Sequence, residues 1–230
     1  MKTFFVAGTD TDIGKTYVCS LLLKEFNKIG YQTFAIKPLA TGCYKNKDGN
    51  LVSDDALELM SNSSLSCHYE TVNPIALPQP IAPNVAADKV GVSLSTLNLC
   101  KKIKSSIQYS AHINIIEGIG GWCVPINKTE LFSDAVNRLQ LPVILVIGIK
   151  LGCLNHALLT IQAMQQSGTK LIGWIANLID PETLYPQEII STLKAQIRAP
   201  CLGVVPYQSK AKIDIAIILK KLHQDGGITG

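Results

Sequence analysis

The sequence predicts an α/β fold in which a parallel sheet is flanked by helices on both faces. Short apolar segments of strand type alternate with segments of helical periodicity along the 230 residues, and this alternation is typical of parallel sheets. A loop bounded by glycines joins the first strand to the first helix. No linker or internal repeat divides the chain, so we expect a single domain over 1–224 and a frayed tail over 225–230.

The first half of the chain is expected to contain, in order, a strand over Lys2–Ala7, a helix over Lys15–Ile29, a strand over Thr33–Ile36, a polar loop over 38–53, a short helix beginning over Asp55–Met60, an irregular loop over 71–84, a helix over Leu94–Ile107 and a buried strand over Ile113–Ile116. Gly30 ends the first helix, because glycine readily adopts a left-handed conformation. Pro38 ends the second strand, and Ser93 is the expected cap of the later helix. Prolines at 74, 78, 80 and 83 argue against a helix in the irregular loop.

The second half continues the alternation, with strands over Val143–Ile147, Leu171–Ala176 and Cys201–Val205 and helices over Leu154–Gln166, Gln187–Ile197 and Asp214–Leu222. Ligands of parallel sheets bind beyond the carboxyl ends of the strands. We therefore expect the residues that follow the strands to converge at one edge of the sheet; these are Gly8, Lys37, Glu117, Lys150 and Asn177.

Composition and charge exclude several classes of protein. Hydrophobic residues make up 47% of the chain and its net charge is +4. The densest basic run, Lys101, Lys102 and Lys104, is better explained as an exposed helix face than as a nucleic-acid site. No apolar run is long enough for a membrane span or a signal peptide. The seven cysteines form no C-x-x-C pair and the four histidines show no metal-ligand spacing, so we expect reduced thiols in a cytoplasmic protein.

The loop Gly8–Thr16 follows an apolar strand and opens an amphipathic helix, which is the context of a phosphate-binding loop. Backbone N–H groups of such a loop surround a phosphate at the helix N-terminus. Lys15 is expected to reach the terminal phosphates and Thr16 to bind Mg²⁺. The loop has five residues, Thr9 to Ile13, where the common form has four. An ordinary glycine turn is the alternative; the motif in its context favours a fold of the P-loop NTPase type.

Charged residues near the ends of two strands are further candidates. Glu117 ends a buried strand before four residues that include three glycines, and a carboxylate there needs a partner or a metal ion. Its alternative is a capping or surface carboxylate. Asp54 and Asp55 precede an apolar helix, so either is a metal ligand or a helix cap. Pro38 fixes the backbone after Lys37 and can aim that lysine inward, whereas a solvated lysine is the alternative.

Several motifs together resemble the dethiobiotin synthetase family. They are G-T-D-T-x-x-G-K-T over Gly8–Thr16, K-P-x-x-T-G over Lys37–Gly42, D-A-L over Asp55–Leu57, N-P at Asn73–Pro74, E-G-x-G-G-W over Glu117–Trp122, G-W-I-A-N over Gly173–Asn177 and A-P-x-L-G over Ala199–Gly203. They occur in the order of the family and extend from residue 3 to about 207. This combination is far more specific than the phosphate-binding loop by itself.

The resemblance implies an ATP- and Mg²⁺-dependent enzyme that closes a ring on 7,8-diaminononanoate. One amine takes up CO₂ as a carbamate, ATP phosphorylates the carbamate, and the second amine displaces phosphate to leave the cyclic urea of dethiobiotin. By the same resemblance Lys37 and Lys15 are catalytic and Thr41 binds the reacting end of the substrate. Thr16, Glu117 and one aspartate hold Mg²⁺, and the D-A-L match favours Asp55 over Asp54.

The resemblance also implies the nucleotide contacts, which are Asp12, Ile13, Gly14, Lys15, Thr16, Tyr17, Asp55, Glu117, Gly118, Ile119, Gly120, Asn177, Leu178, Val205 and Pro206. Asn177 resembles the amide that reads adenine in the family, and Val205 and Pro206 flank the base or simply pack at the end of a strand. Members of the family are homodimers, and the stretch Leu151–Asn155 resembles the segment of the partner subunit that receives the substrate carboxylate, with Leu151 and Asn155 as its contacts.

Two positions depart from the family. The aromatic residue that holds the substrate tail is replaced near Ile189, with Tyr185 close by but displaced. An acidic nucleotide contact after the last strand has no match over 208–213. These departures leave open which nucleotide the protein prefers and how tightly it binds the tail of the substrate.

Three other functions fit the sequence less well. Partition-type ATPases carry a lysine five residues before the loop lysine, where this chain has Asp10. A cobyrinate-type amidase needs a glutamine-hydrolysing domain, for which 230 residues leave little room. A nucleotide-binding regulator without catalysis predicts no role for Lys37 or Thr41.

Overall fold

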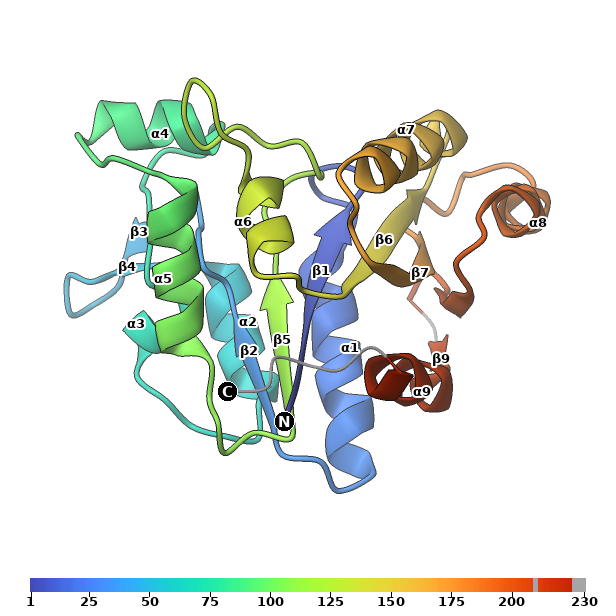
Figure 1. Cartoon of the computed structure of the whole chain (residues 1–230), viewed down its shortest axis with the longest axis horizontal. Helices are drawn as coiled ribbons and strands as arrows, with labels where there is room; N and C mark the ends of the chain where they lie inside the picture. Colours follow the sequence, from blue (N-terminus) through green and yellow to red (C-terminus); the bar gives the residue numbers. More distant parts are fainter. Residues whose placement is uncertain (209–210, 225–230) are drawn as a thin grey trace.

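The computed structural model describes residues 1–208 and 211–224, and its centre is a seven-stranded sheet in the order β2-β5-β1-β6-β7-β8-β9. The strands are β1 (Lys2–Gly8), β2 (Thr33–Ile36), β5 (Ile113–Glu117), β6 (Val143–Ile149), β7 (Leu171–Leu178), β8 (Cys201–Val205) and β9 (Lys212–Ile213). All pairings are parallel except that of β8 with β9. The arrowheads of β1, β5 and β6 therefore point to one end of the molecule (Figure 1). The predicted α/β architecture is confirmed.

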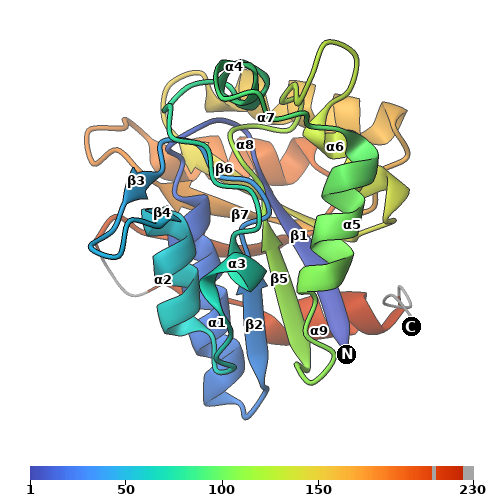
Figure 2. The same cartoon turned by 90° about the vertical axis from the view of Figure 1, so that its left-hand side faces the viewer.

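Helices cover both faces of this sheet (Figures 1 and 2). In the described residues the helices are α1 (Lys15–Lys28), α2 (Asp54–Asn62), α3 (Tyr69–Val72), α4 (Pro83–Lys89), α5 (Thr96–Ser106), α6 (Phe132–Arg138), α7 (Cys153–Gln166), α8 (Pro186–Gln196) and α9 (Ile215–Gln224). Side chains alternate along β1, so Phe4 and Val6 join the core under α1 and α9, whereas Phe5 and Ala7 join the core under α5 to α8. Two buried cores follow from this alternation.

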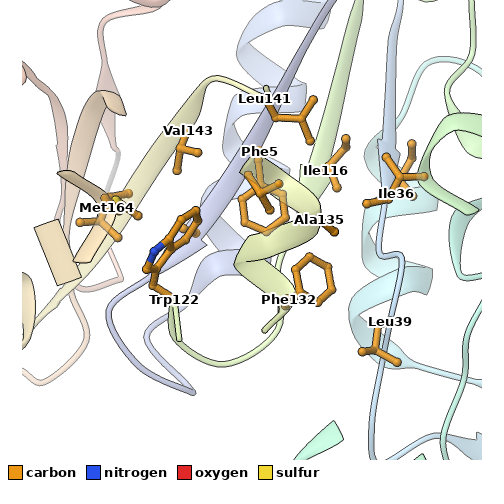
Figure 3. Close-up of a cluster of buried hydrophobic side chains, with 14 of the residues drawn as sticks. Phe5, Ile36, Leu39, Ile116, Trp122, Phe132, Ala135, Leu141, Val143 and Met164 are labelled. Carbon is orange, nitrogen blue, oxygen red and sulfur yellow. The ribbon is translucent and has the colours of Figure 1, made fainter. Parts of the chain in front are cut away.

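Aromatic rings fix the segment that follows β5. Phe5 packs against Phe132 with ring centroids 5.6 Å apart and against Trp122 at 6.5 Å. Figure 3 shows these rings gathered with Ile116 and Ala135, between β1, β5 and α6. The first turn of α6 is also tied down, because the Asp134 carboxylate accepts from the Leu131 N–H at 2.7 Å. The loop after Glu117 therefore packs on the hydrophobic core through Trp122.

Several expectations for the individual elements were wrong. The helix expected from Leu94 begins at Thr96, and its cap is Ser95, whose hydroxyl accepts from Asn98 N–H at 3.2 Å, in place of Ser93. The loop over 71–84 is irregular only in its middle, since α3 ends within it and Pro83 occupies the first turn of α4. Proline is well tolerated at that position because the N–H it lacks has no helical partner.

Several short elements were missed altogether. A two-stranded hairpin of β3 (Tyr44–Lys45) and β4 (Leu51–Val52) lies inside the polar loop over 38–53, and α6 and β9 lack a clear periodic pattern because each is short. The expected tail at 225–230 lies outside the described residues.

One glycine in β6 lets the sheet support the phosphate-binding loop. A Cβ atom on Gly148 would lie 2.7 Å from Ile13 Cγ2 and 2.9 Å from Ile179 Cδ1. Ile13 is completely buried under the loop. The missing side chain is therefore what allows this close packing.

We predict that Gly148→Ala destabilises the protein by about 1–3 kcal/mol, because the added methyl group overpacks the contact with Ile13. Urea denaturation of the purified variant measures this. Gly121→Ala is the matched control, since a Cβ there would find its nearest heavy atom at 3.5 Å, and it should change the free energy of unfolding by less than about 0.5 kcal/mol. Equal stability of Gly148→Ala and the wild-type protein would contradict the packing argument.

Candidate functional site

A pocket of about 950 Å³ opens at the carboxyl ends of β1, β2 and β5. Its wall is formed by the loop before α1, the residues after β2, the start of α2, the proline-containing segment before α4 and the loop after β5. Among the residues predicted from the sequence, those that line it are Asp12, Gly14, Lys15, Thr16, Tyr17, Lys37, Thr41, Asp55, Glu117, Ile119 and Gly120. Residues that are distant in the sequence thus meet at one edge of the sheet, as parallel strands require.

The loop between β1 and α1 has the backbone of an anion cradle. Asp12 and Gly14 both have positive φ angles, of 54° and 79°, and Gly14 begins the helix without a side-chain cap. A Cβ atom on Gly14 would collide with the amide nitrogen of Asn177. The Lys15 ammonium donates to the Asp10 carbonyl at 2.9 Å, and burial together with nearby Lys37 lowers the pKa of Lys15 to about 8. Uncapped N–H groups and a buried ammonium suit a phosphate.

The Lys37 ammonium lies at the centre of a cluster of polar groups in the wall of the pocket. Its ammonium donates to Glu117 Oε1 at 2.6 Å, to Asp55 Oδ2 at 2.7 Å and to the Gly118 carbonyl at 3.1 Å. Parallel pairing of β2 with β5 places Ile36 beside Ile116, so the two next residues, Lys37 and Glu117, emerge side by side. The sequence therefore folds a buried cation between two carboxylates.

The pKa values of the cluster follow from burial and from these three charges. Burial alone would lower the pKa of Lys37, but Glu117 and Asp55 more than offset it and raise the pKa above the usual range. Burial opposes ionisation of Asp55, yet the adjacent Lys37 holds its pKa below the ordinary value. Burial dominates at Glu117 and raises its pKa, with Lys37 acting in the opposite direction.

The donor set beside Lys37 fits a small divalent cation. The Thr16 hydroxyl donates to Glu117 Oε1 at 2.8 Å, while Glu117 Oε2 is buried and has no hydrogen-bond partner among the described residues. An orphaned buried carboxylate oxygen is costly and calls for a cation or water. Hydroxyl and carboxylate oxygens are the ligands that Mg²⁺ prefers.

The structure distinguishes the two neighbouring aspartates at the start of α2. Asp55 points into the pocket and contacts Lys37. Asp54 is exposed, and its Oδ1 accepts from the Tyr44 hydroxyl at 2.7 Å, which ties it to the β3–β4 hairpin. Neither side chain caps α2. Of the two, Asp55 is therefore the one in a position to bind a metal ion.

A second group of predicted residues lies on the far side of the phosphate-binding loop. Asn177 and Val205 are register partners at the ends of β7 and β8, next to Leu178 and Pro206. The buried Asn177 amide donates to the Ile13 carbonyl at 2.8 Å, so part of its hydrogen-bonding capacity supports the loop. These four residues do not line the pocket around Lys37.

Two of the predicted substrate contacts, Leu151 and Asn155, lie outside this pocket and are exposed. Leu151 is 98% exposed at the turn before α7. Near the departures from the family pattern, Ile189 packs partly against the core, whereas Tyr185 is 72% exposed at the start of α8. Neither exposed side chain lines the pocket around Lys37.

Sequence reasoning missed several lining residues, namely Thr11, Ala40, Glu58, Pro80, Ile81, Ala82, Pro83, Gly121, Cys123, Val124 and Pro125. Glu58 had a signal, because it lies three residues after Asp55 and so on the same helix face. The segment Pro80–Pro83 had none, since its approach to Gly42 depends on tertiary packing. All seven cysteines are free, and Cys123 is exposed.

Comparison with known proteins decides the family. The family model described as an AAA domain matches residues 2–212. An ATP-dependent dethiobiotin synthetase BioD from Cellvibrio japonicus is 45% identical over 94% of this chain and 93% of its own length. Proteins of the same name from Pseudomonas aeruginosa (strain UCBPP-PA14) and Baumannia cicadellinicola are 44% and 41% identical over 92% and 96% of this chain and 92% and 97% of their own lengths. The chain belongs to the dethiobiotin synthetase family.

Solved structures that resemble this member of the family share its fold only. The MinC:MinD complex of Aquifex aeolicus matches with a TM-score of 0.54 at 14% identity, over 99% of this chain and 88% of that one. The signal recognition particle receptor FtsY of Elizabethkingia anophelis in complex with GDP gives 0.53 at 13% identity, over 96% and 63%. The fold is therefore of the P-loop NTPase type, as predicted. Within the described residues, no helix has the length and apolar character to cross a membrane.

We predict that Lys37→Met destabilises the folded protein by about 3–5 kcal/mol at pH near 8, because it leaves the Glu117 carboxylate buried without its cation. The loss should shrink as the pH falls to about 5.5: a carboxyl whose pKa is raised by folding binds a proton in the folded state first, so acid favours that state. Urea denaturation at both pH values measures this.

The matched control is Lys28→Met, which removes a lysine whose side chain is 67% exposed in a surface pair with Glu25. It should cost less than about 1 kcal/mol at either pH. A Lys37→Met variant as stable as wild type at both pH values would show that the cation does not stabilise the carboxylates.

Proposed function

We propose that this protein converts 7,8-diaminononanoate, CO₂ and ATP to dethiobiotin, ADP and phosphate. The observation that carries the proposal is the buried ammonium of Lys37, held within 2.7 Å of both Glu117 and Asp55 and beside a phosphate-binding loop. Membership in the dethiobiotin synthetase family supports the same reaction.

Phosphoryl transfer to a carbamate oxygen requires positioning and neutralisation of negative charge more than covalent help. In the proposed mechanism Lys15 binds the terminal phosphates of ATP, and Lys37 binds the carbamate and the phosphoryl group in transfer. Thr41, in the wall of the same pocket, donates to the reacting end of the diamine. The free amine then attacks the carbamic–phosphoric anhydride, phosphate leaves, and the ring closes.

Thr16, Asp55 and Glu117 are the proposed ligands of Mg²⁺. The fit rests on the unpartnered Glu117 Oε2 and on the Thr16 hydroxyl beside Oε1. When bound, the ion neutralises charge on the nucleotide phosphates. Ile119 and Gly120 follow Glu117 in the wall of the pocket, and with Gly118 they are further proposed nucleotide contacts. A Cβ on Gly118 would lie 2.7 Å from Phe5 Cζ, so the chain lies close against the sheet there.

The adenine is proposed to lie beyond the phosphate-binding loop, against Asn177, Leu178, Val205 and Pro206. An amide side chain that has one N–H in use at the Ile13 carbonyl keeps a second donor and its oxygen for a base edge. Asp12, Ile13, Gly14 and Tyr17 complete the proposed nucleotide contacts. We also propose that residues 1–224 act as one domain in the cytoplasm.

We further propose a homodimer in which Leu151 and Asn155 of one chain receive the carboxylate tail of the diamine bound to the other. The start of α7 supports this, because Gly152 leaves its first turn without a side-chain cap and free N–H groups attract a carboxylate. The almost fully exposed side chain of Leu151 at the same point is accessible to a second chain.

Formation of dethiobiotin is the direct test of the activity. Purified protein is mixed with ATP, Mg²⁺, bicarbonate and 7,8-diaminononanoate, and the product is sought by mass. We expect dethiobiotin and ADP in equal amounts. A folded protein that binds ATP but makes no dethiobiotin, with hydrolysis indifferent to the diamine, would instead indicate a nucleotide-binding regulator.

Removing one hydroxyl group tests the proposed metal site. We predict that Thr16→Val raises the Mg²⁺ concentration needed for half-maximal turnover about tenfold or more, because an oxygen ligand is replaced by a methyl group. Thr3→Val is the matched control, since the Thr3 hydroxyl is buried in β1 and has no hydrogen-bond partner among the described residues. An unchanged Mg²⁺ requirement in Thr16→Val would remove Thr16 from the proposed ligand set.

A charge at the exposed leucine tests the homodimer. We predict that Leu151→Glu converts dimers to monomers in sedimentation velocity and raises the KM for the diamine, because a buried carboxylate would oppose both association and the substrate tail. Leu97→Glu is the control, since Leu97 is 52% exposed on α5, far from α7 in the fold. A monomeric wild-type protein would contradict the proposed assembly.

A further inference from the structure

The backbone around Lys37 is held by residues that have no place in the mechanism above. Pro38 ends β2, and the last register pair of β2 with β5 is Ile36 with Ile116, so the Lys37 peptide lies outside the sheet ladder. Its N–H donates to the Val72 carbonyl at 2.8 Å. Its carbonyl accepts from the Asn73 side-chain amide at 2.6 Å. Val72 and Asn73, at the end of α3, therefore satisfy both the N–H and the carbonyl of Lys37.

Asn73 is itself positioned by a tyrosine. Its side-chain oxygen accepts from the Tyr69 hydroxyl at 2.9 Å, and it is only 3% exposed. The same hydroxyl oxygen accepts from the Ser53 backbone N–H at 2.8 Å. Ser53 is the residue at which α2 begins, two positions before Asp55. Burial raises the pKa of Tyr69 to about 12, so the hydroxyl keeps the proton that it donates.

These bonds form one continuous chain, which we call the Tyr69–Asn73 bridge: Ser53 N–H to Tyr69 Oη, Tyr69 O–H to Asn73 Oδ1, and Asn73 Nδ2–H to the Lys37 carbonyl. One end of the bridge fixes the start of α2, which carries Asp55. The other end fixes the backbone of Lys37. The bridge thus joins the two elements whose side chains meet 2.7 Å apart in the pocket.

We propose that Tyr69 and Asn73 are positioning residues that set the distance between Lys37 and Asp55. Neither lines the pocket, so each acts on the reaction only through the two groups it places. This inference rests on the roles proposed above for Lys37 and Asp55. It gives a function to the Asn73–Pro74 motif, which the proposed mechanism leaves unused.

The chemistry explains why such a bridge is useful. Lys37 and Asp55 come from different elements, and α2 begins after a small hairpin that the main sheet does not include. A misplacement of about 1 Å by a change remote from the reacting atoms can reduce a rate by about a hundredfold. Tyr69 is a half-buried side chain of fixed length whose hydroxyl is hydrogen-bonded to both Ser53 and Asn73, and this limits that movement.

Tyr69→Phe removes the hydroxyl and opens the bridge while keeping the ring. We predict that kcat for dethiobiotin formation falls about tenfold and that the KM for ATP changes less than about twofold, because the phosphate-binding loop has no bond to the bridge. Tyr31→Phe is the matched control, being a half-buried tyrosine at the opposite end of β2. A Tyr69→Phe protein with wild-type kcat would overturn the proposal.

A double-mutant cycle separates positioning from general stability. If Tyr69 acts by placing Asp55, Tyr69→Phe should lower kcat much less in an Asp55→Asn background than in the wild-type protein. An equal loss in both backgrounds would overturn the proposal. Asn73→Asp provides a second break in the bridge, because it replaces the donor to the Lys37 carbonyl by an acceptor, and it is used if Tyr69→Phe does not fold.

Failure of the proposed function gives a different pattern. Lys37→Ala with wild-type turnover would reject the role of Lys37 whatever Tyr69 does. Lys37→Ala with strongly reduced turnover, together with a harmless Tyr69→Phe, would reject the bridge alone. Retention of the thermal midpoint in Tyr69→Phe, measured with and without Mg²⁺ and ADP, shows that a fall in kcat does not come from unfolding.

Discussion

The contact of the buried Lys37 ammonium with two carboxylates is the constraint on which the rest of the site depends. It needs the end of β2, the end of β5 and the first turn of α2 at one point. Parallel pairing supplies the first two, because Ile36 and Ile116 are register partners and the next residues leave the sheet together. The first turn of α2 is positioned by hydrogen bonds outside the sheet, such as that of the Ser53 N–H with the Tyr69 hydroxyl. Taking these charges out of water is costly unless each finds its partner, so the three elements must assemble together.

The four charged side chains that meet around Lys37 balance one another. Lys15 and Lys37 are buried cations, and Glu117 and Asp55 are the facing carboxylates. A cluster of two positive and two negative groups is tolerable within a folded core, whereas burial of two lysines alone would disfavour their charged forms. In the proposed function, an anionic phosphate and a divalent cation would enter as a pair, each taking over contacts that the protein groups make with one another.

The sequence predicted the location of the site residues where the signal is local. The phosphate-binding loop, Lys37 before its proline and Glu117 before its glycines each occupy one short segment, and a strand order that brings strand ends together follows from the alternation of strands and helices. The choice between Asp54 and Asp55 was not local. It depends on Tyr44, which takes Asp54 outward, and on Lys37, which takes Asp55 inward. No spacing rule distinguishes two adjacent carboxylates at the start of a helix, and only the D-A-L resemblance favoured Asp55.

The errors are concentrated in the connection between β2 and β5. Ser93 was the expected cap of α5, but the chain passes it and begins the helix after Ser95, because a polar residue caps only if its backbone is extended and its hydroxyl reaches the first turn. The hairpin over 44–52 is made of exposed or half-buried residues for the most part, which leaves no strong hydrophobic period. The helix α4 begins at Pro83, where a count of prolines argued for a loop.

The two halves of the site are therefore specified in different ways. The half proposed to bind the nucleotide depends on contiguous motifs packed on the sheet, where Gly148 allows close packing against Ile13 and Asn177 donates to the Ile13 carbonyl. The half around Asp55, Thr41 and Pro80 depends on long-range hydrogen bonds such as those of Tyr69 and Asn73. Proteins as distant as MinD at 14% identity share the sheet and its fold. Divergence of chemistry on this fold is then expected to concentrate in the connection between β2 and β5, where few contacts are imposed by the sheet and substrate-facing residues are free to change.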